Sequence, residues 1–195
     1  MVPGTHEESL DQMRLVSRTR RPAAGPDRRH ERRGQSLVEF SLILAPLMLI
    51  LLGIIQFGFI FNSYVTLANA AREGGRTATI HVYDRTKSKT QNDLLRHEAI
   101  RQAFVSSMNL LATSAPNFAN GGTWTSSGGT FTNGDLVVSY TIPTGVPDSD
   151  PRTGQQVTVR ATYHQDLIIP LVAGLLPRDA GGRLGLVAEV KMVIN

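Results

Sequence analysis

Residues 32–40 read RRGQSLVEF, and the chain becomes apolar directly after them, from residue 42 to residue 61. At about 1.5 Å of rise per residue, this run makes a helix about 30 Å long, which matches the hydrocarbon core of a bilayer. A soluble helix that is apolar on every side needs a large protein around it, and the rest of this chain is too small and too polar. The pattern therefore predicts a single membrane span at about residues 37–61.

Glu39 lies close to the N-terminal end of this predicted span. Placing an ionised carboxylate in hydrocarbon costs about 2.5–3.5 kcal/mol on insertion scales, so an acid in this position is a functional-site hypothesis by default. The simpler alternative is that the side chain of Glu39 extends back to the membrane surface.

The net charge of +4 belongs mainly to the N-terminal segment. Residues 1–34 contain eight Arg and five acidic residues, a net charge of +3, which leaves +1 for the rest of the chain. Positive charge before a span keeps that end in the cytoplasm, so the predicted topology is N-terminus in and C-terminus out. The arginines closest to the span carry this prediction: Arg28, Arg29, Arg32 and Arg33. Nucleic-acid binding is not expected, because no basic face with interleaved aromatic residues occurs elsewhere.

An ordinary secretory signal peptide fits this N-terminus poorly. The charged region is long, the apolar run exceeds the usual length of about 7–15 residues, and no Ala-x-Ala site follows it. Two possibilities remain open: an uncleaved signal anchor, or a leader that is removed on the cytoplasmic side of the apolar segment.

The segment from Gly34 to Phe40 resembles the processing site of type IV pilin-like proteins, and within them of the TadE-like pseudopilins of the Tad (tight adherence, or Flp) pilus machinery. The resemblance implies that a prepilin peptidase cuts after Gly34. Gln35 would become the N-terminus, with Glu39 as the fifth mature residue and Phe40 as the sixth, where Tyr is commoner. The resemblance also implies that Glu39 meets the N-terminal amine of an adjacent subunit.

A second block, NAAREGGR at residues 69–76, resembles the segment that follows the span in TadE-like proteins, although Gly75 stands where Ala is usual. The matching motif residues are Arg72, Glu73, Gly74 and Arg76. Their spacing indicates a solvated, salt-bridged helix face. A contact with a partner pilin or with the assembly platform is the alternative.

The resemblance therefore implies a minor pseudopilin of the cytoplasmic membrane, a structural protein that works with a prepilin peptidase, other Tad pilins and pseudopilins, and the assembly platform. An uncleaved single-pass anchor that presents a surface-binding domain is the main alternative, and an extracytoplasmic enzyme is a distant one. No His-Glu-x-x-His, Gly-x-Ser-x-Gly, phosphate-loop or dinucleotide motif occurs, and the chain has no cysteine. We expect no catalytic residue, cofactor or small-molecule substrate.

A calcium site is conceivable in the second half of the chain, but turn chemistry explains the same residues more simply, and no metal site is predicted. The oxygen-bearing residues in question are Asn133, Asp135, Asp148, Ser149 and Asp150.

The spacing of apolar residues predicts that one helix continues beyond the membrane, from about residue 36 to residue 79. Pro46 frees the carbonyl of Leu42 and predicts a kink or local melting. Gln56 is expected to hydrogen-bond either another subunit or its own helix, and both possibilities stay open.

The predicted fold class is α+β. A leader (residues 1–34) precedes the long membrane-spanning helix (35–80), and a small extracytoplasmic domain (81–195) adds a second helix and an antiparallel sheet. Thr90 or Asn92 is the predicted cap of the second helix, whose apolar positions include Ile100, Phe104, Met108 and Leu111. Residues 115–134 predict a loop or short hairpin whose aromatic residues, Trp124 and Phe131, pack back on the domain.

Alternating residues predict strands at 136–142, 156–163 and 184–194. Residues 167–176 are apolar but too short to span a bilayer. They predict either a short helix that covers the core or an apolar docking surface.

Overall fold

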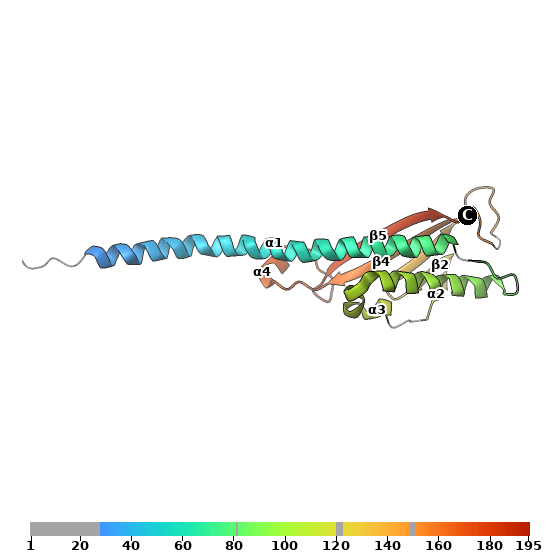
Figure 1. Cartoon of the computed structure of the whole chain (residues 1–195), viewed down its shortest axis with the longest axis horizontal. Coiled ribbons are helices and arrows are strands. Elements are labelled where there is room, and N and C mark those ends of the chain that lie inside the picture. The colour runs from blue at the N-terminus through green and yellow to red at the C-terminus, as the bar shows by residue number, and fades with distance from the viewer. Residues whose placement is uncertain (1–27, 81, 120–122, 149–150) are drawn as a thin grey trace, which may run out of the picture. The chain divides into compact units, whose positions relative to one another are not determined.

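The computed structural model describes residues 28–80, 82–119, 123–148 and 151–195 (Figure 1). It divides into two units, residues 1–47 and 48–195, which are described separately. The elements are the helices α1 (Arg28–Ile80), α2 (Lys89–Met108), α3 (Pro116–Ala119) and α4 (Pro170–Ala173), a 3-10 helix η1 (Asn109–Ser114), and the strands β1 (Thr125–Ser127), β2 (Thr130–Asn133), β3 (Leu136–Thr141), β4 (Gln156–Gln165) and β5 (Leu184–Val193). The predicted α+β class is confirmed.

Helix α1 is 53 residues long and begins at Arg28, earlier than the predicted start at residue 36. Its end at Ile80 agrees with the prediction. Helical residues continue through Pro46, so local melting, one of the two predicted effects of this proline, does not occur. Gly34 lies within the helix rather than in extended backbone.

Within α1, the part from Gly34 to Ile80 contains a stretch that is long and apolar enough to cross a membrane, with a mean hydropathy of 2.5. None of that stretch is buried, whereas the core helix of a soluble protein would be mostly buried. From residue 48 to residue 65 the large exposed apolar side chains of α1 are Met48, Leu49, Ile50, Leu51, Leu52, Ile54, Ile55, Phe57, Phe59, Phe61, Tyr64 and Val65. An apolar surface of this size is normally in contact with lipid or with another protein. The length of the apolar stretch matches the thickness of a bilayer.

The sheet has five antiparallel strands in the order β1-β2-β3-β4-β5, so each strand pairs with its neighbour in sequence. The predicted strands are confirmed to within one or two residues. Of the two structures predicted for residues 115–134, the hairpin is observed in residues 125–133, where β1 and β2 pair around Gly128 and Gly129, both at positive φ. This conformation is accessible to glycine at little steric cost. Residues 116–119 instead form the short helix α3, which the sequence did not predict.

One face of the sheet carries the core. In β4, Val157, Val159 and Ala161 alternate with more exposed residues, and the register places each directly opposite an inward residue of β5: Met192, Val190 and Ala188. Directly opposite residues of an antiparallel pair lie on the same face. The C-terminal part of α1 and helix α2 pack against this face (Figure 1).

Helix α2 begins with a capping box in which the Ser88 hydroxyl accepts from the Gln91 backbone N–H and the Gln91 side chain accepts from the Ser88 N–H. The predicted caps, Thr90 and Asn92, are therefore wrong. The Asn92 side chain instead bonds to the backbone of Asp84, Lys87 and Ser88, which holds the preceding turn. Since α2 ends at Met108, Leu111 belongs to η1 rather than to this helix.

The buried stripe of α1 over the sheet consists of small residues: Ala70, Ala71, Gly74, Gly75 and Ala78. A Cβ on Gly74 would lie 3.4 Å from Ile100 of α2, which is an ordinary contact. A Cβ on Gly75 would lie 2.8 Å from Cγ1 of Val190, which is closer than real Cβ contacts. Gly75 therefore sets how closely α1 approaches β5.

We predict that Gly75→Ala destabilises the domain by about 1–3 kcal/mol, because the added methyl overpacks the contact with Val190. Gly74→Ala is the control on the adjacent residue; it should be neutral or slightly stabilising, since Ala is the better helix former by about 0.5–1 kcal/mol. The measurement is chemical unfolding of the detergent-solubilised chain, followed by circular dichroism. Val190→Ala should restore part of the loss in the Gly75→Ala background. Equal stability of the two glycine variants would contradict this packing.

Candidate functional site

The residues of the predicted cleavage site lie on consecutive turns of α1. The side-chain amide of Gln35 donates a hydrogen bond of 3.0 Å to Oε1 of Glu39, four residues later, and both side chains are exposed. Residue 35 and the Glu39 carboxylate thus share one side of the helix. Phe40 is also exposed. A protease that binds extended backbone would have to unwind α1 around Gly34, and glycine weakens a helix there by about 0.5–1 kcal/mol relative to alanine.

The four arginines of the topology prediction occupy the first two turns of α1, and their side chains lie outside the described structure. The predicted leader lies mostly outside it as well, since the description begins at residue 28. These two predictions remain untested.

The motif residues after the apolar run occupy two sides of α1. Gly74 is buried against α2, whereas Arg72 and Arg76 are exposed. Arg76 donates to both carboxylate oxygens of Glu73, at 2.5 and 3.0 Å. This hydrogen bonding lowers the pKa of Glu73 below its usual value. The predicted salt-bridged face is therefore confirmed, and such an exposed pair contributes little to stability.

Gln56 is fully buried although it lies in the apolar part of α1. Its side-chain oxygen accepts from the backbone N–H groups of Ile168, at 3.0 Å, and of Ile169, at 3.3 Å. The same helix, one of the two predicted partners, is therefore wrong for the side-chain oxygen, and the other predicted partner, another subunit, remains untested by a single chain. The same contact places α4: a short helix forms in residues 167–176, as one alternative predicted, but it lies beside Gln56 on α1 rather than among the main core residues (Figure 1).

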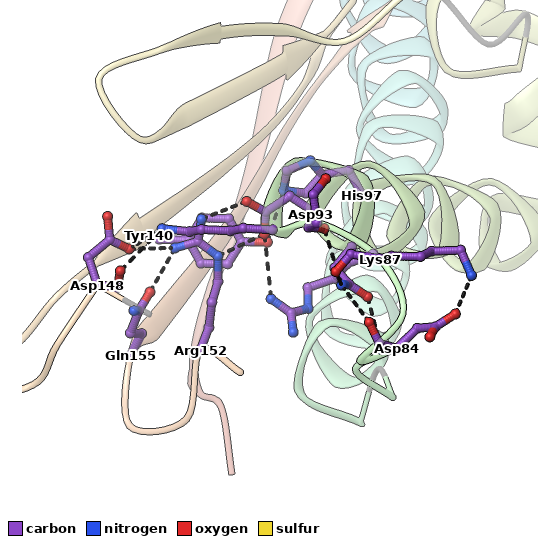
Figure 2. Close-up of polar contacts among 12 residues, drawn as sticks. Asp84, Lys87, Asp93, His97, Tyr140, Asp148, Arg152 and Gln155 are labelled. Carbon is purple, nitrogen blue, oxygen red and sulfur yellow. Dashed lines mark hydrogen bonds and ion pairs between the residues drawn. The ribbon is translucent and has the colours of Figure 1, made fainter. Parts of the chain in front are cut away.

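A buried ion pair joins α2 to the loop before β4. Arg152 donates to the Asp93 carboxylate through Nε and Nη2, at 2.8 and 2.7 Å, and both side chains are nearly inaccessible to solvent. The Nη1 group of Arg152 donates to Gln155, at 2.8 Å. Figure 2 shows these side chains converging between α2 and the sheet. The charges of Asp93 and Arg152 are thus partnered by each other, and the pair links α2 to the loop before β4.

Tyr140 completes this cluster. The Arg152 guanidinium lies over its ring, with Cζ 4.1 Å from the ring centroid, and its hydroxyl lies 2.9 Å from Nε2 of His97 (Figure 2). The His97 ring also contacts Trp124 and Phe131, at centroid distances of 5.1 and 4.1 Å. The prediction that these aromatic residues pack back on the domain is confirmed. Burial raises the pKa of Tyr140 to about 12.

Of the residues considered for calcium, Ser149 and Asp150 lie outside the described residues. Asp148 pairs with Lys89 at 2.6 Å, and Asp135 accepts from Asn117 at 2.9 Å. Among the described residues, no group of three or more His, Cys, Asp or Glu side chains could hold a metal ion.

Sequence reasoning missed the Asp93–Arg152 pair and the Gln56 contact. A signal for the first existed: the apolar stripe of α2, when extended one turn toward the N-terminus from Ile100, reaches Arg96, His97 and Asp93, which are buried. No local signal indicated the Gln56 contact, because its partners lie 112 and 113 residues away.

In the part of the chain that the structure describes, the fold and these sites define a class of protein with one candidate membrane helix that continues into an α+β domain. The family model described as TadE-like protein matches residues 34–76, which include the predicted cleavage glycine, the apolar run and the motif around Glu73. This match confirms the resemblance and suggests involvement in Tad pilus assembly. Comparison with curated proteins and with solved structures gave no match.

We predict that Arg152→Met lowers the free energy of unfolding by about 3–5 kcal/mol, because it removes both short hydrogen bonds to the buried Asp93 carboxylate and leaves only the 3.8 Å ion pair with Arg96. Asp93→Asn should recover part of this loss in the same chain. The control is Lys89→Met, which removes an exposed pair and should cost about 0–1 kcal/mol. Denaturant unfolding of the three variants tests this; equal losses for Arg152→Met and Lys89→Met would contradict it.

We further predict a loss of stability in alkali that depends on Tyr140. Its pKa is raised to about 12 in the folded chain, against about 10 in the unfolded chain. As the pH rises above 10, the unfolded chain releases this proton first, so the stability present below pH 10 declines toward pH 12. The decline should be smaller in Tyr140→Phe than in the control Tyr64→Phe, which alters an exposed tyrosine. Identical pH profiles of unfolding for the two variants would contradict the assignment.

Proposed function

We propose that this chain is a minor pseudopilin of a Tad (Flp) type IV pilus-like secretion system, cut after Gly34 by a prepilin peptidase and acting through helix packing in the membrane and in the assembly. The observation that carries this proposal is the TadE-like match over residues 34–76. The match starts at the predicted cleavage residue and ends within the motif that precedes the end of α1.

The physical character of α1 supports this role. From residue 48 to residue 61 its large side chains are exposed and apolar, which suits lipid first and neighbouring helices later. From residue 70 onward its buried stripe is small and holds the domain. The same helix can therefore hold the domain through its C-terminal part, while its apolar part passes from contact with lipid to contact with neighbouring helices.

Cleavage after Gly34 would give Glu39 a new partner. The α-amino group of Gln35 would stand at the start of the helix, four residues before the carboxylate. The Gln35–Glu39 hydrogen bond supports this geometry, because it places residue 35 on the same side of α1 as the carboxylate. An amine and a carboxylate can neutralise each other within one subunit or between neighbours, which lowers the cost of holding Glu39 in lipid or in a filament.

The proposed topology follows from the arginines before the span. Residues 1–34 would form a cytoplasmic leader, α1 would cross the cytoplasmic membrane once, and residues 81–195 would lie on the extracytoplasmic side. The partners in this proposal are the membrane, the peptidase, other Tad pilins and the assembly platform.

An uncleaved anchor that presents a surface-binding domain is the second candidate. It is favoured by a groove of about 440 Å³ next to α2, whose lining includes Leu94, Trp124 and Phe131. The N-terminus of the mature protein separates the two candidates, because only a pseudopilin would begin at Gln35.

We predict that co-expression with the matching prepilin peptidase yields a protein that begins at Gln35. Gly34→Leu should abolish this processing because the side chain obstructs close approach to the backbone, whereas Gly34→Ala should retain part of it. Mass spectrometry of the N-terminal peptide measures both. Recovery of an intact peptide across residues 34 and 35 from the unaltered chain would overturn the cleavage proposal.

Glu39→Ala should leave processing largely intact but reduce incorporation into pili, because the new amine loses its carboxylate partner. Glu189→Ala, which removes an exposed acid on β5, is the matched control. The measurement is the ratio of this protein in sheared pili to that in membranes. Equal ratios for Glu39→Ala and the unaltered chain would remove the proposed role of Glu39.

A further inference from the structure

Residues 166–178, here called the α4 loop, carry apolar side chains that the domain does not cover. Ile168 is 65% exposed and Leu175 is 81% exposed. Ala173, between them, is buried. The α4 loop therefore has an inner side that packs and an outer side that presents two large aliphatic groups.

Hydrogen bonds at two points of α1 hold this loop and Gln165, the last residue of β4, which directly precedes it. At the first point, Gln56 accepts from the backbone of Ile168 and Ile169. At the second, the Ser63 hydroxyl donates to the Gln165 side chain, at 2.5 Å. Because residues seven apart lie on the same face of a helix, Gln56 and Ser63 form a single polar edge to which the loop is attached. Their spacing corresponds to about 10 Å along the axis.

The apolar surface of α1 continues past this attachment. Phe57, Phe59 and Phe61 are exposed on the neighbouring faces of the helix, between the two attachment residues. Ile168 is thus held beside a stretch of α1 whose own side chains belong to the candidate membrane span, and Leu175 follows it in the same loop.

The backbone of the α4 loop suits a medium without water. The N–H groups of residues 168 and 169 donate to Gln56, and those of residues 173, 174 and 175 donate to carbonyls within the loop. Pro170 has no N–H group to satisfy. Irregular backbone enters hydrocarbon only where its polar groups have partners, and between residues 168 and 175 five of the seven N–H groups have them.

Charge at the end of the loop also fits a lipid surface. Arg178 is exposed and follows Leu175 by three residues. A long cationic side chain next to a buried apolar group can reach the phosphates of lipid headgroups.

We propose that the α4 loop is a second membrane-contacting element: Ile168 and Leu175 enter the edge of the hydrocarbon in the leaflet nearest the domain, and Arg178 meets the headgroups. The occupant of this surface is the lipid of the bilayer that α1 crosses, so the inference rests on the membrane span of the proposed function. Contact at α1 and at the loop fixes the depth and the rotation of the domain at the membrane surface.

The test uses the full chain, which has no native cysteine. Single cysteines replace Leu175 in the loop, Leu110 in η1 as a control, and Ile54 on α1. Leu110 is matched to Leu175 because it is an equally exposed leucine, at 83%, and Ile54 is 64% exposed within the candidate span. Each variant carries an environment-sensitive fluorophore and is reconstituted into phosphatidylcholine–phosphatidylglycerol vesicles that contain nitroxide quenchers at defined acyl depths.

We expect the label at residue 175 to be quenched by the shallow nitroxide several-fold more than the label at residue 110. The label at residue 54 should be quenched as well. If residue 54 is quenched and residue 175 behaves like residue 110, the inference is wrong and the span stands. If residue 54 is not quenched, the span itself fails, and with it both the proposed function and this inference.

Gln56→Leu tests the attachment of the α4 loop to α1, because leucine is similar in size to glutamine but has no oxygen that can accept hydrogen bonds from the loop. In the Leu175→Cys chain, Gln56→Leu should reduce the quenching of the label at residue 175 several-fold. In the Ile54→Cys chain, the same substitution should leave the quenching of the label at residue 54 unchanged. Asn62→Leu, an exposed polar residue on the same helix, should alter neither. Unchanged quenching at residue 175 in the Gln56→Leu chain would show that Gln56 does not hold the loop in lipid.

Discussion

One continuous helix has to satisfy two different environments, and the rest of the structure depends on how α1 does so. Between residues 48 and 61 its apolar side chains are exposed. From residue 67 its buried stripe carries little more than a methyl group at most positions, which lets the sheet and α2 approach the backbone closely. Large apolar residues suit lipid because they need no fixed partner, whereas small residues suit a rigid contact because they lose little entropy on burial.

The domain is held to this helix by a few specific contacts between distant parts of the chain. Gly75 lies against Val190 of the last strand, and Gln56 holds the α4 loop. The pair of Asp93 and Arg152 joins α2 to the segment that enters β4. These contacts join the helices, the hairpin and the remaining strands into one domain.

The sequence predicts the elements whose signals are local. Alternation in residues 156–163 predicts β4 because the side chains of a strand alternate between core and solvent, and the apolar run with its preceding arginines predicts the candidate span. The start of α2 was misplaced because Ser88, Thr90 and Asn92 are all good caps; only the spacing of Ser88 to Gln91 distinguishes the true one. The partners of Gln56 and Asp93 could not be predicted, because each contact joins residues that only the folded chain brings together.

The proposed function and the inferred contact of the α4 loop with lipid both require that lipid covers α1 from residue 48 to residue 61. The direct measurement is the accessibility of spin labels, placed singly along residues 48–69 of the reconstituted full chain, to lipid-soluble oxygen and to a water-soluble nickel chelate. If lipid covers this segment, labels from Met48 to Phe61, except at Gln56, are more accessible to oxygen than to the nickel chelate. The label at Asn69 is more accessible to the nickel chelate. Access of the nickel chelate to labels throughout residues 48–61 would contradict this prediction.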